Sequence, residues 1–415
     1  MSRALQDNLA TMAAAKPLEK CDIVVGLMAG SDADHVGLPL TKSYEGLSQS
    51  YPGVPSVIAY CGPETLKNAK DLFLNLPSPV PKVFLGAPAG PDSKERSLLN
   101  LMAYAQKLQA KAIVTIDADL STVKRTWIGR LAGPVLSGQA SLTSPFYHSL
   151  KFDTPVTTLV AYPLFRALFG RRIRQPFLCD RAFSGELNDI FLAKKDWPKG
   201  LPYFMTEMTL SLLAIANGAK ICQSFMANPR IGSALLPIDT ATTASLFIDA
   251  CRSLFELIVR YPGLWLKVSR SRPTPVTGTD LTPPVSPART LASPNQFLES
   301  LRTVVTKEAK FWSGTFQGAY DHLYRSLAYD DYRLLTVDPA EWANLLFDSA
   351  LAYRRLDEAG RQTLLECLSA AFLGRLLTWI RDAAGLTLGQ MEARNEEEAR
   401  MFESSKSRLV AGWGD

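Results

Sequence analysis

The sequence predicts a three-layer α/β domain built on a parallel sheet, followed by an α-helical C-terminal region. Three observations predict this fold class. Short runs of β-forming residues alternate with amphipathic helices over the first third of the chain. One of these runs ends in two carboxylates, Asp117 and Asp119, and the last third reads as helices that follow a proline-rich stretch.

The composition is that of an ordinary soluble protein. The chain has 415 residues, of which 47% are hydrophobic and 20% charged. A net charge of +5 suits phosphorylated small molecules, and the absence of a long basic block argues against nucleic acid. The six cysteines form no CxxC pair, which indicates reduced thiols and no structural zinc. With neither a signal-type segment nor an apolar run of membrane-spanning length, we expect a cytoplasmic protein without a membrane span.

The first predicted strand covers residues 22–27 and leads into the small-residue turn 28–34. Backbone amides in such a turn can hold a phosphate or the edge of a base, and a plain tight turn is the alternative. Further strands are expected at 55–60 and 82–85, with a helix at 65–76 between them. Lys94 begins the next amphipathic helix, where it could reach a phosphate or simply remain solvated.

The segment KAIVTIDADL, residues 111–120, is the centre of the predicted domain. Residues 112–116 read as a buried strand, and Asp117 and Asp119 follow at its carboxyl end. Ligands of open α/β sheets bind at this edge, and two neighbouring carboxylates favour a shared Mg²⁺ or Mn²⁺ beside a phosphate. The alternative is a helix cap or turn, in which Asp is common.

Beyond this segment we expect a strand at 140–147 and a helix at 156–169, followed by Arg171, Arg172 and Arg174, which could bind an anion or serve the helix C-terminus.

Residues 245–267 predict another helix. The sequence VDPAE at 337–341 predicts a helix start with Asp338 as N-cap. Apolar residues between 364 and 380 cover more than one helix face, which indicates packing on two sides or a subunit interface, and the tail is expected to be a fraying solvated helix.

The order of several motifs resembles one family, the retaining GT-A fold glycosyltransferases that make glucosylglycerate, glucosyl-3-phosphoglycerate and mannosylglycerate. The similarity covers roughly residues 20–270 and includes the segments VVGLMAGSDAD, KVFLGAPAGPDSKERSLLN, IVTIDADL, SPFY, VTTLVAYPLFRALFGRRIRQP, FSGEL and LPYFMTEMTLSLLAIANGAKICQSF. The resemblance implies a divalent metal, Mg²⁺ or Mn²⁺, held by Asp117 and Asp119 on the diphosphate of a GDP-, UDP- or ADP-hexose. It also assigns donor binding to Leu27, Ala29, Gly30, Ser31, Asp32, Lys94, Asp117 and Ala118.

The resemblance implies the remaining site residues together with several departures. Asp119 and Glu207 would be catalytic, Glu207 lying by the transferred sugar. Substrate contacts would come from Thr157, Asp180, Glu207, Asn228 and Arg230. The family's phosphate-gripping arginine is replaced by Pro155, which favours an unphosphorylated acceptor. The family's metal-binding histidine is absent, so either Asn228 or water would complete the coordination or metal binding would be weakened. Arg230 could instead neutralise the diphosphate directly.

The predicted organisation is a leader at 1–20, a GT-A domain at 21–267, a proline-rich linker or lid at 268–295 and a helical region at 296–415. The predicted function is retaining transfer of glucose or mannose from a nucleotide sugar to glycerate or a similar small hydroxy acid. Two alternatives remain: a transferase with another small acceptor, and a diverged paralogue that binds nucleotide without turnover. A homo-oligomer formed through the C-terminal helices is also expected.

Overall fold

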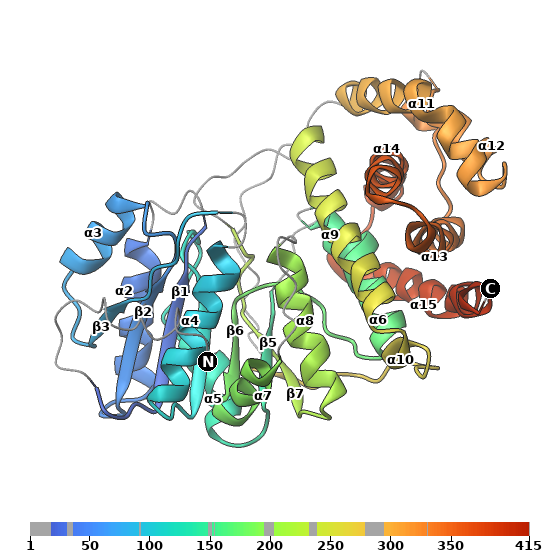
Figure 1. Cartoon of the computed structure of the whole chain (residues 1–415). Coiled ribbons are helices and arrows are strands. Elements are labelled where there is room, and N and C mark those ends of the chain that lie inside the picture. The colour runs from blue at the N-terminus through green and yellow to red at the C-terminus, as the bar shows by residue number, and fades with distance from the viewer. Residues whose placement is uncertain are drawn as a thin grey trace. The chain divides into compact units, whose positions relative to one another are not determined.

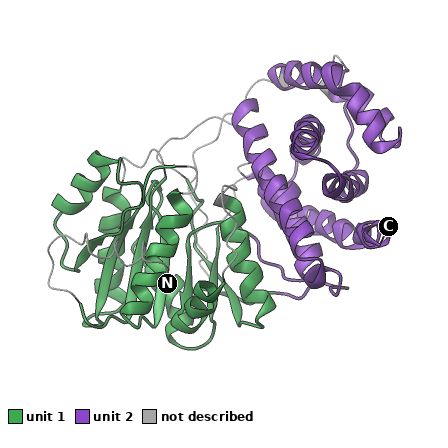
Figure 2. Cartoon of the chain, in the orientation of Figure 1, with its two compact units in different colours: residues 1–148, 175–235, 274–285 green, residues 149–174, 236–273, 286–415 purple. Residues whose placement is uncertain are grey.

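The computed structural model describes residues 18–30, 36–90, 93–147, 152, 154–194, 203–231, 239–278, 294–329 and 331–414. Contacts divide the chain into two compact units (Figure 2). Unit 1 contains residues 1–148, 175–235 and 274–285, and unit 2 contains residues 149–174, 236–273 and 286–415. Unit 2 therefore takes in two segments from the middle of the chain as well as its C-terminal part. The domain boundaries drawn from the sequence stay a prediction.

Unit 1 is built around an eight-stranded sheet in the order β3-β2-β1-β4-β6-β5-β7-β8 (Figure 1). The strands are β1 Ile23–Met28, β2 Ser56–Cys61, β3 Lys82–Phe84, β4 Ala112–Asp117, β5 Leu142–Phe146, β6 Arg181–Ser184, β7 Ile221–Phe225 and β8 Val276–Thr277. Five of these strands lie within two residues of the positions predicted from the sequence. The structure adds β6, β7 and β8.

The sheet is mixed rather than parallel throughout, because β6 runs antiparallel to both β4 and β5. All the other strand pairs are parallel. The chain enters β6 from the edge at which β4 ends, since Thr115 of β4 pairs with Arg181, the first residue of β6. The residue before β6, Asp180, is thereby delivered to the carboxyl edge of the parallel strands.

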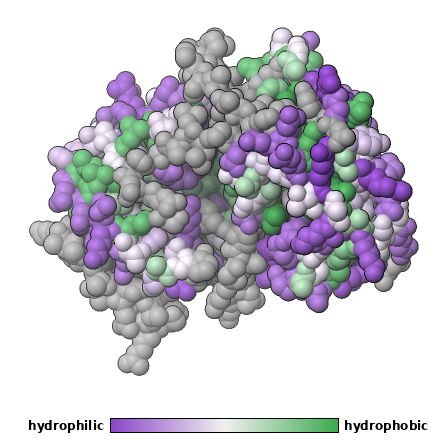
Figure 3. Space-filling view, turned by 90° about the horizontal axis from the view of Figure 1, so that it is seen from above, coloured by the Kyte–Doolittle hydropathy of each residue, from purple (hydrophilic) through white to green (hydrophobic). Residues whose placement is uncertain are grey.

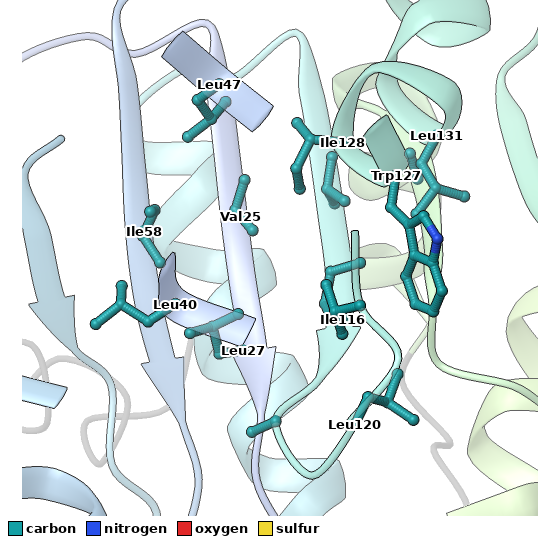
Figure 4. Packing of buried hydrophobic residues seen from close by; sticks show 14 of the residues in the cluster. Val25, Leu27, Leu40, Leu47, Ile58, Ile116, Leu120, Trp127, Ile128 and Leu131 are labelled. Carbon is teal, nitrogen blue, oxygen red and sulfur yellow. The ribbon is translucent and has the colours of Figure 1, made fainter. Parts of the chain in front are cut away.

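Helices cover both faces of the sheet, as the three-layer prediction requires. They are α2 Gly37–Ser50, α3 Lys67–Asn75, α4 Ser93–Lys107, α5 Thr126–Leu136, α7 Gly185–Ala193 and α8 Tyr203–Ala216. Leucine side chains of α2 and Trp127, Ile128 and Leu131 of α5 pack on alternate residues of β1, β2 and β4 (Figure 4). On the opposite face α4 lies so close that a Cβ added at Gly26 would be 2.3 Å from Leu101 Cδ2.

Unit 2 is helical. It contains η2 Thr157–Ala161, α6 Tyr162–Phe169, α9 Thr240–Arg260, α10 Pro262–Trp265, α11 Pro294–Phe316, α12 Asp321–Ser326, η3 Tyr332–Leu334, α13 Pro339–Arg355, α14 Glu358–Ala383 and α15 Leu388–Trp413. The predicted start of α13 is confirmed, because the Asp338 carboxylate accepts the N–H groups of Ala340 and Glu341.

The helix predicted at 156–169 begins as the π-helix η2 and continues as α6. Pro163 explains part of this irregularity, since proline has no N–H to donate to the carbonyl of Leu159 four residues earlier. That carbonyl accepts the indole N–H of Trp342 instead, at 2.9 Å. The indole of Trp342, in α13, thus replaces the missing backbone donor inside unit 2.

The C-terminal helix α15 corrects the expectation of a fraying solvated tail. One face of it is buried, including Met391, Phe402 and Leu409. Its glutamates also meet arginines of the 166–174 segment: Arg166 pairs with Glu396 and Glu403, and Arg174 pairs with Glu392 and Glu396. These arginines therefore bind carboxylates of their own chain, and the salt bridges fix α15 against α6.

The apolar residues of α14 pack on two sides, against α9 and α11. By length and composition α14 could cross a membrane, but 83% of its apolar window is buried inside the protein, as in a core helix of a soluble protein. The face shown in Figure 3 mixes hydrophilic residues with small groups of hydrophobic ones. A homo-oligomer built on the C-terminal helices stays a prediction.

Candidate active site

The two sequence-predicted carboxylates lie at the carboxyl edge of the sheet. Asp117 is the last residue of β4 and lies beside Met28, the last residue of β1. The N–H of Ala118 donates to Met28 O at 3.0 Å, so the loops after β1 and β4 leave the sheet together. The N–H of Asp119 donates to Asp117 Oδ1 at 3.1 Å, a short turn of the kind Asp favours.

A third carboxylate and an arginine complete this edge. Asp180 is fully buried and accepts the backbone N–H of Asp117 on Oδ1 at 2.7 Å. Arg230 spans the two acids: its Nε donates to Asp180 Oδ2 and its Nη2 to Asp117 Oδ2, both at 2.7 Å. Charge-assisted bonds of this length are among the stronger polar contacts in proteins. The guanidinium thus crosslinks segments that are far apart in the sequence.

The loop that carries Arg230 is fastened to the loop after Asp119. Ser121 N–H donates to Ile231 O at 3.0 Å, and Ile231 N–H donates to Thr122 Oγ1 at 3.1 Å. Asn228 Nδ2 donates to Thr122 O at 3.4 Å. Hydrogen bonds to Ser121 and Thr122, which follow the acidic pair, therefore hold the main chain at Ile231, next to Arg230.

Lys94 also belongs to this edge. It lies in the first turn of α4, and a Cβ added at Gly30 would be 3.1 Å from Lys94 Cε. Burial by itself would raise the pKa of the Asp117 carboxyl, but the charges of Arg230 and Lys94 hold that pKa below its ordinary value. Burial opposes the charge of Arg230 too, yet Asp180 and Asp117 raise its pKa well above the usual value. Both groups are therefore ionised at neutral pH.

We call Asp117, Asp119, Asp180, Arg230, Lys94 and Gly30 the edge cluster. All six were named from the sequence, and the structure brings them together. Ser31 and Asp32 lie outside the described residues. Leu27, Ala29 and Ala118 are fully buried members of the hydrophobic core, and their part in donor binding stays a prediction. Thr157 is a buried residue of unit 2, and its acceptor role also stays a prediction.

Glu207 has a partner that sequence reasoning missed. Its Oε2 lies 3.0 Å from Nη2 of Arg181, and both side chains are 1% exposed. Arg181 further donates to the carbonyl of Glu207 at 3.1 Å and to Leu178 O at 2.9 Å. Nothing in the sequence around Arg181 signals this, because the pairing joins β6 to α8. The sugar-binding role of Glu207 stays a prediction beside this structural one.

The donor set fits a divalent cation with one condition. Mg²⁺ is commonly held by one or two carboxylates together with waters and substrate phosphates, and Asp117 and Asp119 provide two carboxylates. Oδ2 of Asp117, however, is bonded to Arg230. Among the described residues no group of three or more His, Cys, Asp or Glu side chains gathers as a complete metal site. A cation here would need Nη2 of Arg230 to leave Asp117.

A cavity of about 910 Å³ lies at the opposite edge of the sheet. Its lining includes Lys111, Ser141 and Lys220, each directly before a strand, and it shares no residue with the edge cluster. In open α/β sheets, ligands bind outside the carboxyl ends of the strands. The carboxyl edge is therefore the candidate active site.

Comparisons with known proteins found matches among solved structures only. No protein-family model matches the chain, and a comparison with curated proteins found no match. Among solved structures, glucosyl-3-phosphoglycerate synthase from Mycobacterium tuberculosis in complex with phosphoglyceric acid matches with 19% identity and a TM-score of 0.41, over 61% of this chain and 82% of that one. The same enzyme with Mn²⁺, UDP-glucose and phosphoglyceric acid gives 20% and 0.38 over 62% and 82%.

Mannosyl-3-phosphoglycerate synthase from Rubrobacter xylanophilus matches with 16% identity and a TM-score of 0.40, over 61% of this chain and 82% of that one. These structures are glycosyltransferases of the type that the sequence motifs resemble. The fold of this chain is defined by its own strand order and register, given above.

Proposed function

We propose that this protein is a cytoplasmic nucleotide-sugar-dependent glycosyltransferase of the retaining type, which transfers glucose or mannose to glycerate or a similar small hydroxy acid. The observation that carries the proposal is the edge cluster. It holds two neighbouring carboxylates, a buried third one, and the cations Arg230 and Lys94, at the sheet edge where ligands of open α/β folds bind. The order of the sequence motifs supports the same class.

The chain's own residues suit the departure of a diphosphate. In glycosyl transfer the largest developing charge lies on the leaving phosphate oxygens, so preorganised cations there lower the barrier. Arg230 offers a planar fork that matches phosphate oxygens, and Lys94 offers a compact charge beside the small residue Gly30. Mg²⁺ or Mn²⁺ held by Asp117 and Asp119 would offset further diphosphate charge.

The alternative is a protein that binds nucleotide and does not transfer sugar. The observation that favours it is the engagement of Asp117 by Arg230, which competes with a metal for the same oxygen. Release of nucleoside diphosphate separates the two: the protein is incubated with UDP-, GDP- and ADP-hexoses, Mg²⁺ or Mn²⁺, and D-glycerate. We expect acceptor-dependent release with one donor, lost in Asp119→Ala. Binding of a nucleoside diphosphate without release from any donor would support the alternative.

The acceptor is proposed to be unphosphorylated, because Pro155 stands where the resembled family places an arginine for the acceptor phosphate. Proline offers no charge and no N–H to an anion. We therefore expect D-glycerate or another unphosphorylated hydroxy acid to give a higher kcat/KM than 3-phosphoglycerate. Competition between the two acceptors measures this, and preference for the phosphorylated compound would contradict the proposal.

A further inference from the structure

We infer that Arg230 is an exchangeable cation: without ligand it occupies Asp117, and it transfers Nη2 to the diphosphate when a divalent cation takes its place. This rests on the proposed function for the identity of the ligand, a nucleoside diphosphate. The Arg230 guanidinium makes two contacts, one to Asp180 and one to Asp117, and only the contact to Asp117 is exchanged. Arg230 therefore weakens the binding of the metal alone and strengthens the binding of the diphosphate.

The two contacts of Arg230 differ in exposure. The Nε contact is made to Asp180, whose side chain is fully buried, whereas the Nη2 contact is made to Asp117, whose side chain is 17% exposed. Asp180 is itself fixed, since its Oδ1 accepts the backbone N–H of Asp117. The Nε contact is the anchored half and the Nη2 contact is the half that a ligand can reach.

The edge cluster must gain positive charge before it can bind a diphosphate. Three carboxylates, Asp117, Asp119 and Asp180, face two cations, Arg230 and Lys94. Counted over these five groups alone, the charge is net negative, which opposes the binding of a diphosphate. A divalent cation reverses the sign, and its access to Asp117 Oδ2 requires Nη2 to leave.

Release of Nη2 breaks none of the hydrogen bonds that hold the backbone of this loop. The main chain at Ile231 stays bonded to Ser121 and Thr122, and Nε can stay on Asp180. A guanidinium held by one edge presents its remaining N–H groups as a fork, the geometry that suits phosphate oxygens. Arg230 would then bridge the buried Asp180 and the diphosphate, so metal and diphosphate each favour binding of the other.

The test uses the full-length protein, Mn²⁺ as the metal and pyrophosphate as a probe free of any base. Arg230→Gln removes the competitor of the metal, so the affinity for Mn²⁺ alone should rise by about tenfold or more, the size of one charge-assisted hydrogen bond. The same variant should bind pyrophosphate with saturating Mn²⁺ about tenfold or more weakly. Mn²⁺ binding is followed by electron paramagnetic resonance and pyrophosphate binding by calorimetry.

Two further variants keep the test decisive. Arg230→Gln leaves Asp180 buried without its cation and can fail to fold, so Asp180→Asn/Arg230→Gln removes both charges and should show the same opposite changes. Arg125→Gln, at an exposed arginine before α5, is the matched control and should change neither affinity. Fold retention is checked by circular dichroism for each variant.

Three results would overturn the inference: equal Mn²⁺ affinity in the parent and in both Arg230 variants, no Mn²⁺ binding by any of them, or equal binding of pyrophosphate by the parent with Mn²⁺ and with chelator. The last would make Arg230 a permanent substitute for the metal. Failure of the proposed function is distinguishable, because it appears as absence of nucleoside diphosphate release while the opposite changes at Arg230 persist.

Discussion

Arg181 and Glu207 form the most deeply buried ion pair described in unit 1, with both side chains 1% exposed. Removing one partner of a buried pair leaves an uncompensated charge, which is strongly destabilising. We expect Glu207→Gln to lower the free energy of unfolding by about 3 kcal/mol. Urea denaturation measures the change, and turnover is scored per folded molecule.

Glu64→Gln serves as the control for this substitution, because Glu64 is an exposed carboxylate of the same unit. It should change the free energy of unfolding by no more than about 0.5 kcal/mol. If Glu207→Gln leaves stability unchanged and lowers turnover about tenfold, the loss of a hydrogen bond to the sugar is the better explanation. In that case Glu207 contacts the substrate as the sequence resemblance implies.

At the residue scale the sequence predicted which side chains lie at the edge and missed how they pair. Asp117 and Asp119 could be placed because a strand pattern stops directly before them. The bridge from Arg230 to Asp180 and Asp117 could not, because it joins residues 50 and 113 positions apart. No local period or motif spans such distances, so only the folded chain shows that the acids already hold a cation.

Strand and helix positions followed from short-range pattern where that pattern was strong. The buried runs of β1, β2 and β4 were visible as β-forming segments. The strand β6 was missed because it has four residues and begins with Arg181, which reads as polar and whose buried carboxylate partner, Glu207, lies in α8. The buried face of α15 was missed because its glutamates look solvated until the arginines beside α6 are known.

The contact between α2 and α5 gives a test at the element scale. A Cβ added at Gly46 of α2 would lie 2.4 Å from the backbone carbonyl oxygen of Arg125, and backbone cannot turn aside as a side chain can. Gly46→Ala should therefore cost about 1–3 kcal/mol of stability through overpacking. The measurement is the midpoint of thermal or urea unfolding.

Gly37→Ala in the same helix is the matched control. Its Cβ would meet only the side chains of Leu76 and Leu72, at 3.4 and 3.8 Å, which is ordinary contact. Alanine also favours the helix by up to about 1 kcal/mol over glycine, so this variant should be neutral or slightly stabilising. Equal stability of the two variants would show that α2 does not approach α5 as closely as described.

At the scale of the whole molecule, the chain crosses between its two units several times, and unit 2 joins segments from three parts of the sequence (Figure 2). Composition shows no boundary at residues 149–174, because the segment continues the same mixture of apolar and basic residues. Its membership in unit 2 depends on long-range contacts, such as the bond from Trp342 to Leu159. Sequence patterns therefore give the elements of this molecule more readily than their grouping.

Lys406 of α15 contacts a distant segment of unit 2, at the end of α10, and gives the last prediction. The side chain is 5% exposed, and its Nζ donates to the carbonyls of Trp265 and Val268, both at 2.6 Å. Burial lowers the pKa of this ammonium from 10.5 to about 8. Between pH 8 and 10.5 the unfolded chain therefore binds more protons at this residue than the folded chain, so raising the pH stabilises the folded state.

Lys406→Met removes this titration, so the Tm of the parent relative to that of Lys406→Met should increase as the pH rises from 7 to 10. Other titrating groups are common to both proteins and cancel in the difference. Lys310→Met, at an exposed lysine of α11, should show a difference that does not change with pH. A difference that stays flat or falls for Lys406→Met would mean that the ammonium reaches solvent, and that α15 is not held to the segment after α10 by a buried lysine.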